Sequence, residues 1–98
     1  MVGVLVTFNL GNSFNEAAVR KIAAESSPKF EGMSQLRSKT FTVDRGRRQA
    51  MNFYVWETAE AARAFFTDDL LDRATALYGV TPGVQFVEIA ALVNNPPA

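Results

Sequence analysis

The sequence predicts an α+β fold built on a four-stranded antiparallel sheet. Apolar and polar residues alternate in four short runs, which is typical of half-buried strands. Two longer stretches repeat apolar residues at helical spacing, one after the first run and one before the last. The strand-like runs cover 1–10, 34–44, 49–56 and 83–93, and the helical stretches cover 13–28 and 58–79. The order strand, helix, strand, strand, helix, strand is that of a ferredoxin-like βαββαβ sheet with both helices on one face.

The first strand and the first helix follow from side-chain spacing and capping residues. Along 1–10 the even-numbered residues are all apolar, so one face of this strand is predicted to be buried. Ser13 and Glu16 have the spacing of a capping box, which predicts a helix start at Ser13. Pro28 predicts the end of this helix, because the residue before a proline disfavours helical backbone.

The second half of the chain carries boundary signals of the same kind. A polar loop at 45–48 joins two strands, and Gly46 supplies the conformational freedom that a hairpin turn needs. Thr58 and Thr67 are both suited to cap helix N-termini, so the second helical stretch is predicted to be kinked or split in two. Gly79 is predicted to end it, because glycine is the favoured helix terminator.

Length and composition narrow the chemistry of the chain. Its 98 residues suffice for one domain, 1–98, with a flexible tail at 94–98. Ten Lys and Arg balance ten Asp and Glu, and a formal net charge of zero argues against nucleic acid or anionic membranes as partners. Cysteine and histidine are absent, which removes thiol nucleophiles, disulfides and the commonest metal ligand. We expect a cytoplasmic protein, because no leader opens the chain and no apolar run approaches the about 20 residues of a membrane span.

An aromatic face on the third strand predicts that the protein pairs with itself. Met51, Phe53 and Val55 are predicted to pack under the helices, which leaves the alternate residues of this strand on the uncovered face. The hairpin register places Phe41, Lys39 and Arg37 opposite Asn52, Tyr54 and Trp56, with Leu5, Thr7 and Asn9 on the same face. Large aromatic side chains bury about 150–250 Å² each when covered. We therefore expect a homodimer whose sheets close into a dimeric α+β barrel. The alternative is a monomer that covers this face with its loop 29–33.

Three segments of the chain carry a family resemblance. They read Leu36-Arg37-Ser38-Lys39-Thr40-Phe41, Asn52-Phe53-Tyr54-Val55-Trp56-Glu57 and Ala61-Ala62-Arg63-Ala64-Phe65-Phe66. With a matching closing segment around Gly79-Val80 and Val87-Glu88-Ile89, they resemble the YdhR-type proteins, a family assigned as monooxygenases from its architecture. The family often opens its third strand with a glycine pair, where this chain has Met51-Asn52, so we expect a reshaped cavity.

The resemblance implies a dimeric barrel related to the small antibiotic-biosynthesis monooxygenases. Those enzymes act on electron-rich aromatic polyketides without metal or flavin, because the substrate itself helps to activate oxygen. The resemblance therefore implies that no cofactor is needed. Haem-degrading members of the same superfamily need a histidine, and this sequence has none, so that branch is excluded.

Lys39 and Tyr54 are the candidate catalytic residues. If they face one another in an apolar cavity, desolvation lowers the pKa of the lysine and raises the pKa of the tyrosine. A neutral lysine can accept a phenolic proton, and an ammonium can hold a developing enolate or peroxide anion. The alternative is that Lys39 reaches the rim of the sheet and Tyr54 is simply packed.

Five further residues are candidates for substrate binding: Asn9, Arg37, Phe41, Asn52 and Trp56. The two aromatic rings either stack on a planar substrate or belong to the core. The two asparagines either orient a carbonyl or an oxyanion, or satisfy the backbone at strand ends. Arg37 either binds a carboxylate or pairs with a glutamate. The nearby acids Asp68, Asp69 and Asp72 are interpreted as helix caps, so no metal site is predicted.

These observations predict a cofactor-independent monooxygenase for a small hydrophobic molecule that is aromatic or enolisable. Its pocket lies between the sheet and the helices or inside the dimer barrel. Deprotonation of a phenol or enol, helped by Lys39 and Tyr54, yields a carbanion that passes an electron to oxygen. An isomerase or decarboxylase would use the same base and anion stabiliser. A non-catalytic ligand-binding or dimerisation module is the third alternative, and a filled barrel would indicate it.

Overall fold

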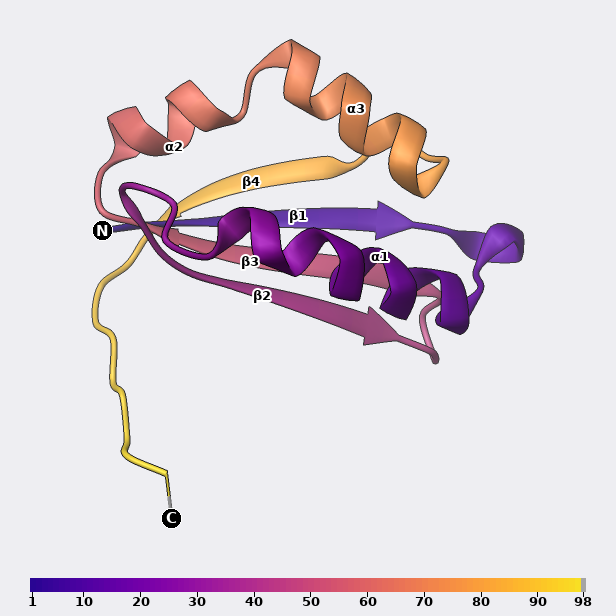
Figure 1. Ribbon diagram of the computed structural model, residues 1–98, viewed down its shortest axis with the longest axis horizontal. Coiled ribbons are helices and arrows are strands. Elements are labelled where there is room, and N and C mark those ends of the chain that lie inside the picture. Colours follow the sequence, from indigo (N-terminus) through magenta and orange to yellow (C-terminus); the bar gives the residue numbers. More distant parts are fainter. Residues whose placement is uncertain (98) are drawn as a thin grey trace.

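A computed structural model, which describes residues 1–97, shows a four-stranded antiparallel sheet with α-helices on one of its faces (Figure 1). The elements are β1 (Val2–Asn9), a 3₁₀ turn η1 (Gly11–Ser13), α1 (Glu16–Phe30), β2 (Leu36–Asp44), β3 (Gln49–Trp56), α2 (Ala59–Phe65), α3 (Asp68–Tyr78) and β4 (Gly83–Glu88). The strand order β2-β3-β1-β4 confirms the predicted ferredoxin-like fold. Ala98, the end of the predicted tail, lies outside the described residues.

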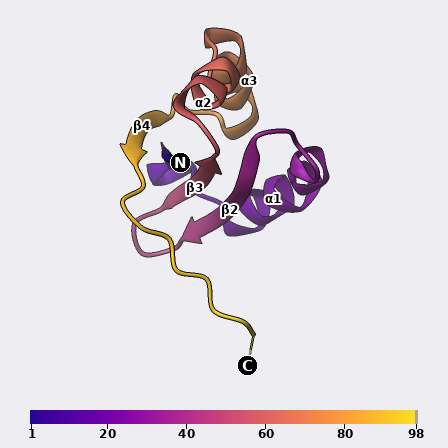
Figure 2. The ribbon, with the colours of Figure 1, turned by 90° about the vertical axis from the view of Figure 1, so that its left-hand side faces the viewer.

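Both helical layers cover the same face of the sheet. Seen after a 90° turn, α1 and the α2–α3 pair lie on one side of the strands, and the C-terminal segment leads away from them (Figure 2). Val4, Val6 and Phe8 of β1 are buried beneath this layer and pack in one cluster with Val19 of α1 and Ala62 of α2. No helix within residues 1–97 combines the length and apolar character needed to cross a membrane.

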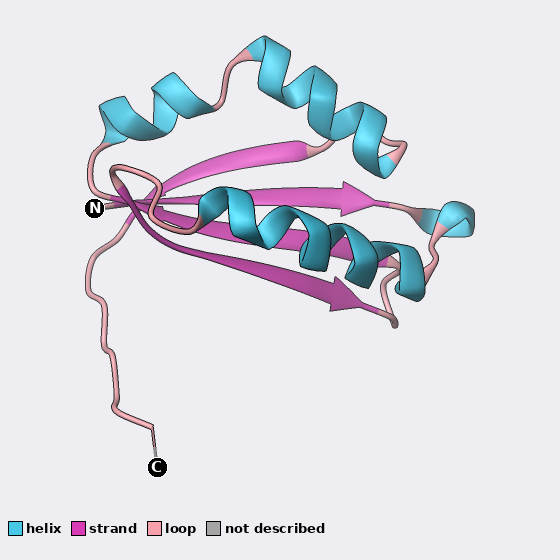
Figure 3. Ribbon diagram, viewed as in Figure 1, coloured by secondary structure: helices cyan, strands magenta, loops and turns pink. Residues whose placement is uncertain are grey.

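Several predicted boundaries are confirmed by side-chain caps. The hydroxyl of Thr58 accepts a hydrogen bond from the backbone N–H of Ala61 at the start of α2, and Thr67 does the same for Leu70 at the start of α3. The second helical stretch is therefore split in two, as Figure 3 shows. Gly79 ends α3 with a left-handed φ of 84°, a conformation that glycine adopts without steric cost.

Both predicted ends of the first helix are wrong. The cap is Asn15, whose Oδ1 accepts from the N–H of Ala18, whereas the Ser13 hydroxyl donates to the Leu10 carbonyl within the 3₁₀ turn. The helix continues through Pro28 to Phe30. Pro28 lacks only its own backbone N–H as a hydrogen-bond donor, and the other residues of the last turn of α1 still form a helix. The extension matters because it brings the Phe30 ring over the sheet.

The hairpin and the last strand also differ from the prediction. Gly46 does not take the left-handed conformation; Arg48 does, with φ of 55°. The turn is held instead by Asp44, whose Oδ1 accepts from the N–H of Arg47 at 3.0 Å. β4 ends at Glu88 rather than at Val93.

The predicted faces of β3 are inverted. Residues that pair directly across antiparallel strands share a face, and Tyr54 pairs with Val4 while Asn52 pairs with Val6. Asn52, Tyr54 and Trp56 therefore lie under the helices. On the uncovered face, Met51, Phe53 and Val55 pair with Thr7, Leu5 and Gly3. The error arose because both sides of β3 are apolar, so alternation separates the two faces without showing which one is covered.

The register of the β2–β3 hairpin is predicted correctly for two pairs out of three. Lys39 lies opposite Tyr54 and Phe41 lies opposite Asn52. The prediction that Arg37 lies opposite Trp56 is wrong, because the register shifts between Leu36 and Ser38. Such a bulge sets one residue out of the ladder and changes the direction of its side chain.

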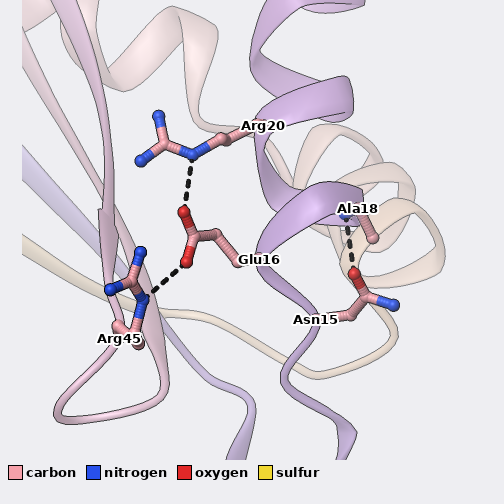
Figure 4. A network of polar contacts seen from close by, with 5 residues as sticks. All are labelled: Asn15, Glu16, Ala18, Arg20 and Arg45. Atoms are coloured by element: carbon pink, nitrogen blue, oxygen red, sulfur yellow. Dashed lines mark hydrogen bonds and ion pairs between the residues drawn. The ribbon is translucent and has the colours of Figure 1, made fainter.

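An ion-pair network ties the β2–β3 hairpin to the start of α1 (Figure 4). The carboxylate of Glu16 accepts from Nε of Arg45 at 2.7 Å and from Nε of Arg20 at 2.9 Å. The hydrogen bond from Arg45, followed by the one from Arg20, lowers the pKa of Glu16 from 4.5 to about 2. The contact holds α1 over the covered face.

Candidate functional site

A cavity of about 330 Å³ lies on the covered face, between the sheet and the helices. The strand residues in its wall include Lys39 and Phe41 of β2 and Asn52 and Tyr54 of β3. The helices contribute mainly apolar side chains: Phe30 from the last turn of α1, Phe65 and Phe66 at the end of α2, and Leu70, Leu71 and Tyr78 from α3. Of the two predicted pocket locations, the one between sheet and helices is where this cavity lies.

The ammonium group of Lys39 lies within a cage of aromatic rings in the cavity wall. Its Nζ is 3.5 Å from the ring centre of Phe30, 4.1 Å from that of Phe41 and 4.4 Å from that of Tyr54. Ring faces carry partial negative charge and attract a cation at these distances. Lys39 and Tyr54 lie side by side in the wall of an apolar cavity, as predicted. The cavity is on the covered face of the sheet, however, and not on the uncovered face.

Burial gives this lysine an unusual protonation equilibrium. Desolvation, with a smaller effect of the neighbouring charge of Lys29, lowers the pKa of Lys39 from 10.5 to about 7. Of the described residues in the cavity wall, Lys29, Lys39 and Arg73 carry positive charge and none is an aspartate or glutamate. Desolvation is therefore not offset by a carboxylate, and the aromatic faces are the main stabilisation of the charged form. Neutral amine and ammonium are both populated near neutral pH.

Tyr54 is held rigidly at the centre of an aromatic cluster. Its ring stacks on Trp56 with centres 6.2 Å apart and meets Phe66 edge-on at 4.9 Å. Burial raises the pKa of the Tyr54 hydroxyl well above its usual range, and the Tyr78 phenol adds to this effect. The Tyr54 hydroxyl therefore stays protonated at neutral pH and acts as a hydrogen-bond donor rather than as a base.

Asn52 and Tyr78 form a polar pair deep in the cavity wall. Asn52 is 3% exposed, and its Nδ2 donates to the Tyr78 hydroxyl at 3.3 Å. The Tyr78 ring stacks on Phe8 with centres 3.7 Å apart, and burial raises the pKa of its phenol. The Oδ1 of Asn52 finds no hydrogen-bond partner within residues 1–97. A buried acceptor without a partner is costly, so this atom is suited to a ligand that presents an O–H or N–H group.

The other three predicted site residues lie outside the cavity wall. Asn9 is exposed and accepts a hydrogen bond from Gln49, and Arg37 is exposed and pairs with Glu57 at 3.4 Å. Trp56 shares the covered face but is 2% exposed and lies beneath the phenylalanines of α2. Its indole Nε1 has no hydrogen-bond partner among residues 1–97. The prediction that these residues share one open face with Lys39 is wrong for Asn9 and Arg37.

Sequence reasoning missed the residues that the helices contribute. The sequence pattern predicts Phe30 in a loop and gives no role in the site to Phe65, Phe66 or Tyr78. One signal was present: Leu70, Leu71, Ala74, Leu77 and Tyr78 recur at helical spacing and form an apolar stripe on α3. Within residues 1–97 no three side chains among His, Cys, Asp and Glu lie close enough to hold a metal ion.

The fold and the cavity define the class of this protein: a ferredoxin-like α+β domain with a pocket between its sheet and its helices. Several solved structures have a similar fold over nearly the whole length of this chain. A protein of unknown function from Nitrosomonas europaea has a TM-score of 0.72 at 17% identity, over 98% of this chain and 95% of that one. The cofactor-independent oxygenase SnoaB from Streptomyces nogalater has a TM-score of 0.66 at 20% identity, over 96% and 97%. A monooxygenase of Streptomyces coelicolor, solved with nanaomycin D, has a TM-score of 0.69 at 17% identity, over 97% and 92%.

At these identities the likeness establishes the fold and not the activity. No protein-family model matches the sequence, and neither does any curated protein. The chain is thus shown to share the fold of the antibiotic-biosynthesis monooxygenases. Its closer resemblance to the YdhR-type proteins stays a prediction.

Proposed function

We propose that this protein is a cofactor-independent monooxygenase for a small hydrophobic substrate that is aromatic or enolisable. The observation that carries the proposal is the position of Lys39, a half-buried amine with a pKa of about 7, in the wall of an apolar cavity of about 330 Å³. A general base is most effective when its pKa lies near the working pH. A cavity of this size and lining suits a compact apolar molecule.

The reaction needs a base, a place for the substrate and access for oxygen. Neutral Lys39 removes a proton from a CH₂ group activated by a neighbouring carbonyl or ring, and the resulting ammonium holds the enolate or phenolate. The anion gives an electron to O₂, and the two radicals combine to a peroxide anion, which takes the proton back from the Lys39 ammonium and becomes a hydroperoxide. Loss of water from the hydroperoxide turns the CH₂ into C=O. The sum is CH₂ plus O₂ giving C=O plus H₂O, so the substrate supplies all the electrons.

The remaining cavity residues have distinct proposed roles. Asn52 accepts a hydrogen bond from a substrate hydroxyl, because its free polar atom is the acceptor Oδ1. Tyr54 donates to an oxyanion, because burial keeps its hydroxyl protonated. Phe41 lies against a planar ring, and Trp56 keeps Tyr54 in place by stacking behind it. The structural neighbours support the proposal, since one is described as a cofactor-independent oxygenase and another as a monooxygenase in complex with the ligand nanaomycin D.

The test is oxygen uptake with an electrode, using anthrone as a substrate with an activated CH₂ group between aromatic rings. Lys39→Met should lower turnover by about 10²–10⁴-fold, the usual contribution of a general base. Lys21→Met, on an exposed surface of α1, is the matched control and should leave turnover unchanged. Equal turnover in both variants would remove the lysine from the mechanism. Substrate consumption without oxygen uptake would instead indicate an isomerase or decarboxylase.

We further propose that two copies pack through the uncovered face of the sheet. Of the residues first predicted there only Leu5 contributes to the support: with Met51 and Phe53 it forms a half-buried apolar surface, and Val87 at its edge is 38% exposed. Gly3 belongs to the same surface, because a side chain at this position would meet the Phe53 ring at 2.8 Å. Leu92 and Val93 of the C-terminal segment are also exposed, which suits a segment that crosses to a partner.

The cytoplasmic location expected from the sequence also stays a prediction.

A further inference from the structure

Lys39 is placed as a nucleophile as well as a base. Its Nζ lies against the rings of Phe30, Phe41 and Tyr54, and no salt bridge within residues 1–97 includes it. Most lysines in proteins are protonated and solvated, and a protonated amine has no lone pair with which to attack carbon. At Lys39 partial burial and the lack of an ion-pair partner among residues 1–97 leave a substantial fraction of the amine neutral near pH 7.

Lys39 borders two cavities. A reaction at its nitrogen can therefore bind the carbonyl compound in one cavity and release water into the other. On one side lies the apolar cavity of about 330 Å³. On the other lies a more polar hollow of about 350 Å³ between the end of α1 and β2, lined by residues such as Ser27, Glu31 and Ser38. Lys39, Phe30 and Phe41 belong to the walls of both. A carbonyl compound can occupy the apolar side while water leaves on the polar side.

We propose that Lys39 forms a reversible imine with a small aromatic aldehyde or ketone bound in the cavity. The amine nitrogen attacks the carbonyl carbon, and the C=O electron pair takes up a proton to give a carbinolamine. The hydroxyl then leaves with one proton as water, and a C=N bond forms. Nothing is oxidised or reduced. The protonated imine keeps its positive charge over the same ring faces that hold the ammonium, where a large and weakly hydrated cation is favoured.

The inference rests on the proposed function, because it places the same substrate in the same cavity. It adds that the substrate carries a carbonyl group, and it gives that group a covalent role. A protonated imine withdraws electrons from the adjacent carbon. Lys39 is then no longer free to act as the base, so water on the side of the polar hollow takes up the proton from this carbon, and an electron-rich enamine forms. Such a carbon is better prepared to give an electron to oxygen than the free ketone is.

The experiment uses the unmodified protein with benzaldehyde as the probe and cyanoborohydride to trap the imine. The chain has three lysines, Lys21, Lys29 and Lys39, so peptide mass spectrometry assigns the adduct without ambiguity. At neutral pH we expect Lys39 to be labelled at least about tenfold faster than the exposed Lys21, since burial lowers the pKa of Lys39 from 10.5 to about 7. Lys39→Arg should lose the adduct in the cavity, and Lys29→Met should keep it.

Labelling of Lys39 no faster than Lys21 would overturn the inference. A model amine added to each sample should be labelled every time, which shows that the trapping chemistry works. Oxygen uptake with anthrone, measured separately, distinguishes the two proposals. Oxygen uptake without an adduct on Lys39 would support the proposed oxygenase activity and contradict the proposed imine. An adduct on Lys39 without oxygen uptake would support the proposed imine and contradict the proposed oxygenase activity.

Discussion

The two faces of the sheet are both apolar, yet they differ in what their polar residues do. On the covered face Asn52 is buried and Lys39 is half-buried, and each lacks the full set of partners that burial normally demands. On the uncovered face Thr40 and Thr42 are exposed to solvent. Apolar residues on a sheet show only that something packs there. Buried polar groups without partners are far rarer, and they indicate where a ligand is to be bound.

The largest expected effect is a difference in the free energy of unfolding between substitutions on the two faces of the sheet. Trp56→Ala on the covered face should cost about 3–5 kcal/mol of the free energy of unfolding, because a large buried ring leaves a cavity that cannot fully collapse. Phe53→Ala on the half-buried uncovered face should cost roughly half of that or less in dilute monomer. Urea denaturation at two protein concentrations measures both. Equal losses at every concentration would show that the two faces are equally buried in a single chain.

A charge on the uncovered face should break the proposed dimer without disturbing the cavity. Phe53→Asp places a carboxylate in the centre of the apolar surface, where pairing would bury it without a partner. Sedimentation at micromolar concentration should find a dimer for the wild type and a monomer for this variant. Ala76→Asp, at an exposed position on α3, is the control and should stay dimeric. A wild type that is monomeric at these concentrations would contradict the dimer.

The covered face should give the protein an unusual dependence of stability on pH. Lys39 has a pKa of about 7 in the folded state and about 10.5 when unfolded, so between these values the unfolded chain binds more protons. Stability should therefore rise with pH from about 7 to 9, with a slope from this group of at most about 1.4 kcal/mol per pH unit. Below pH 7 both states are protonated and the cost of burying the charge is fully present.

Lys39→Met tests this prediction, since a methionine cannot titrate. Unfolding in urea at several pH values should show a smaller rise for this variant than for the wild type. The other titratable or charged groups in the cavity wall are Lys29 from α1, Tyr54 from β3, and Arg73 and Tyr78 from α3, and Glu31 and Arg37 line the hollow on the other side of Lys39. The range ends at about pH 9 because both tyrosines have raised pKa values and act in the opposite sense only at higher pH. An unchanged slope would place the titration elsewhere.

The smallest effect concerns the contact that holds α1 over the covered face. Glu16→Gln removes the carboxylate that pairs with Arg45 and Arg20 and should lower the melting temperature slightly at neutral pH. The pKa of Glu16 is lowered to about 2, so its contribution is present above about pH 4.5 and is lost as the pH falls toward 2. The difference between wild type and variant should shrink over that range and in high salt. A difference that persists at pH 2 would exclude the ion pairs as its cause.

Local signals were sufficient for most of the elements. The strand at 49–56, the caps at Thr58 and Thr67 and the end at Gly79 depend on residues that act on their own backbone, and these predictions are confirmed. The start of α1 was missed because Ser13 and Asn15 both offer a cap, and spacing alone cannot choose between them. The glycine expected to turn the hairpin was not needed, because the Asp44 side chain holds the turn.

For the site, the pairing of Lys39 with Tyr54 came from hairpin register, which is a local property of neighbouring strands. Register also brought Phe41 beside Asn52, and all four line the cavity. Phe30, Phe66 and Tyr78 could not be found in this way, since they reach the cavity from helices that are distant in sequence.

The sequence by itself determined the order of the elements, the fold class and the presence of a lysine beside a tyrosine on one side of a hairpin. Only the tertiary structure decided which side that is. Alternation assigns residues to two faces by short-range geometry, but covering a face depends on where α1 and α3 settle, which is a long-range packing property. When α1 settles over the sheet it brings Phe30 against Lys39 and helps to desolvate the amine, which changes an ordinary lysine into a group that titrates near neutral pH.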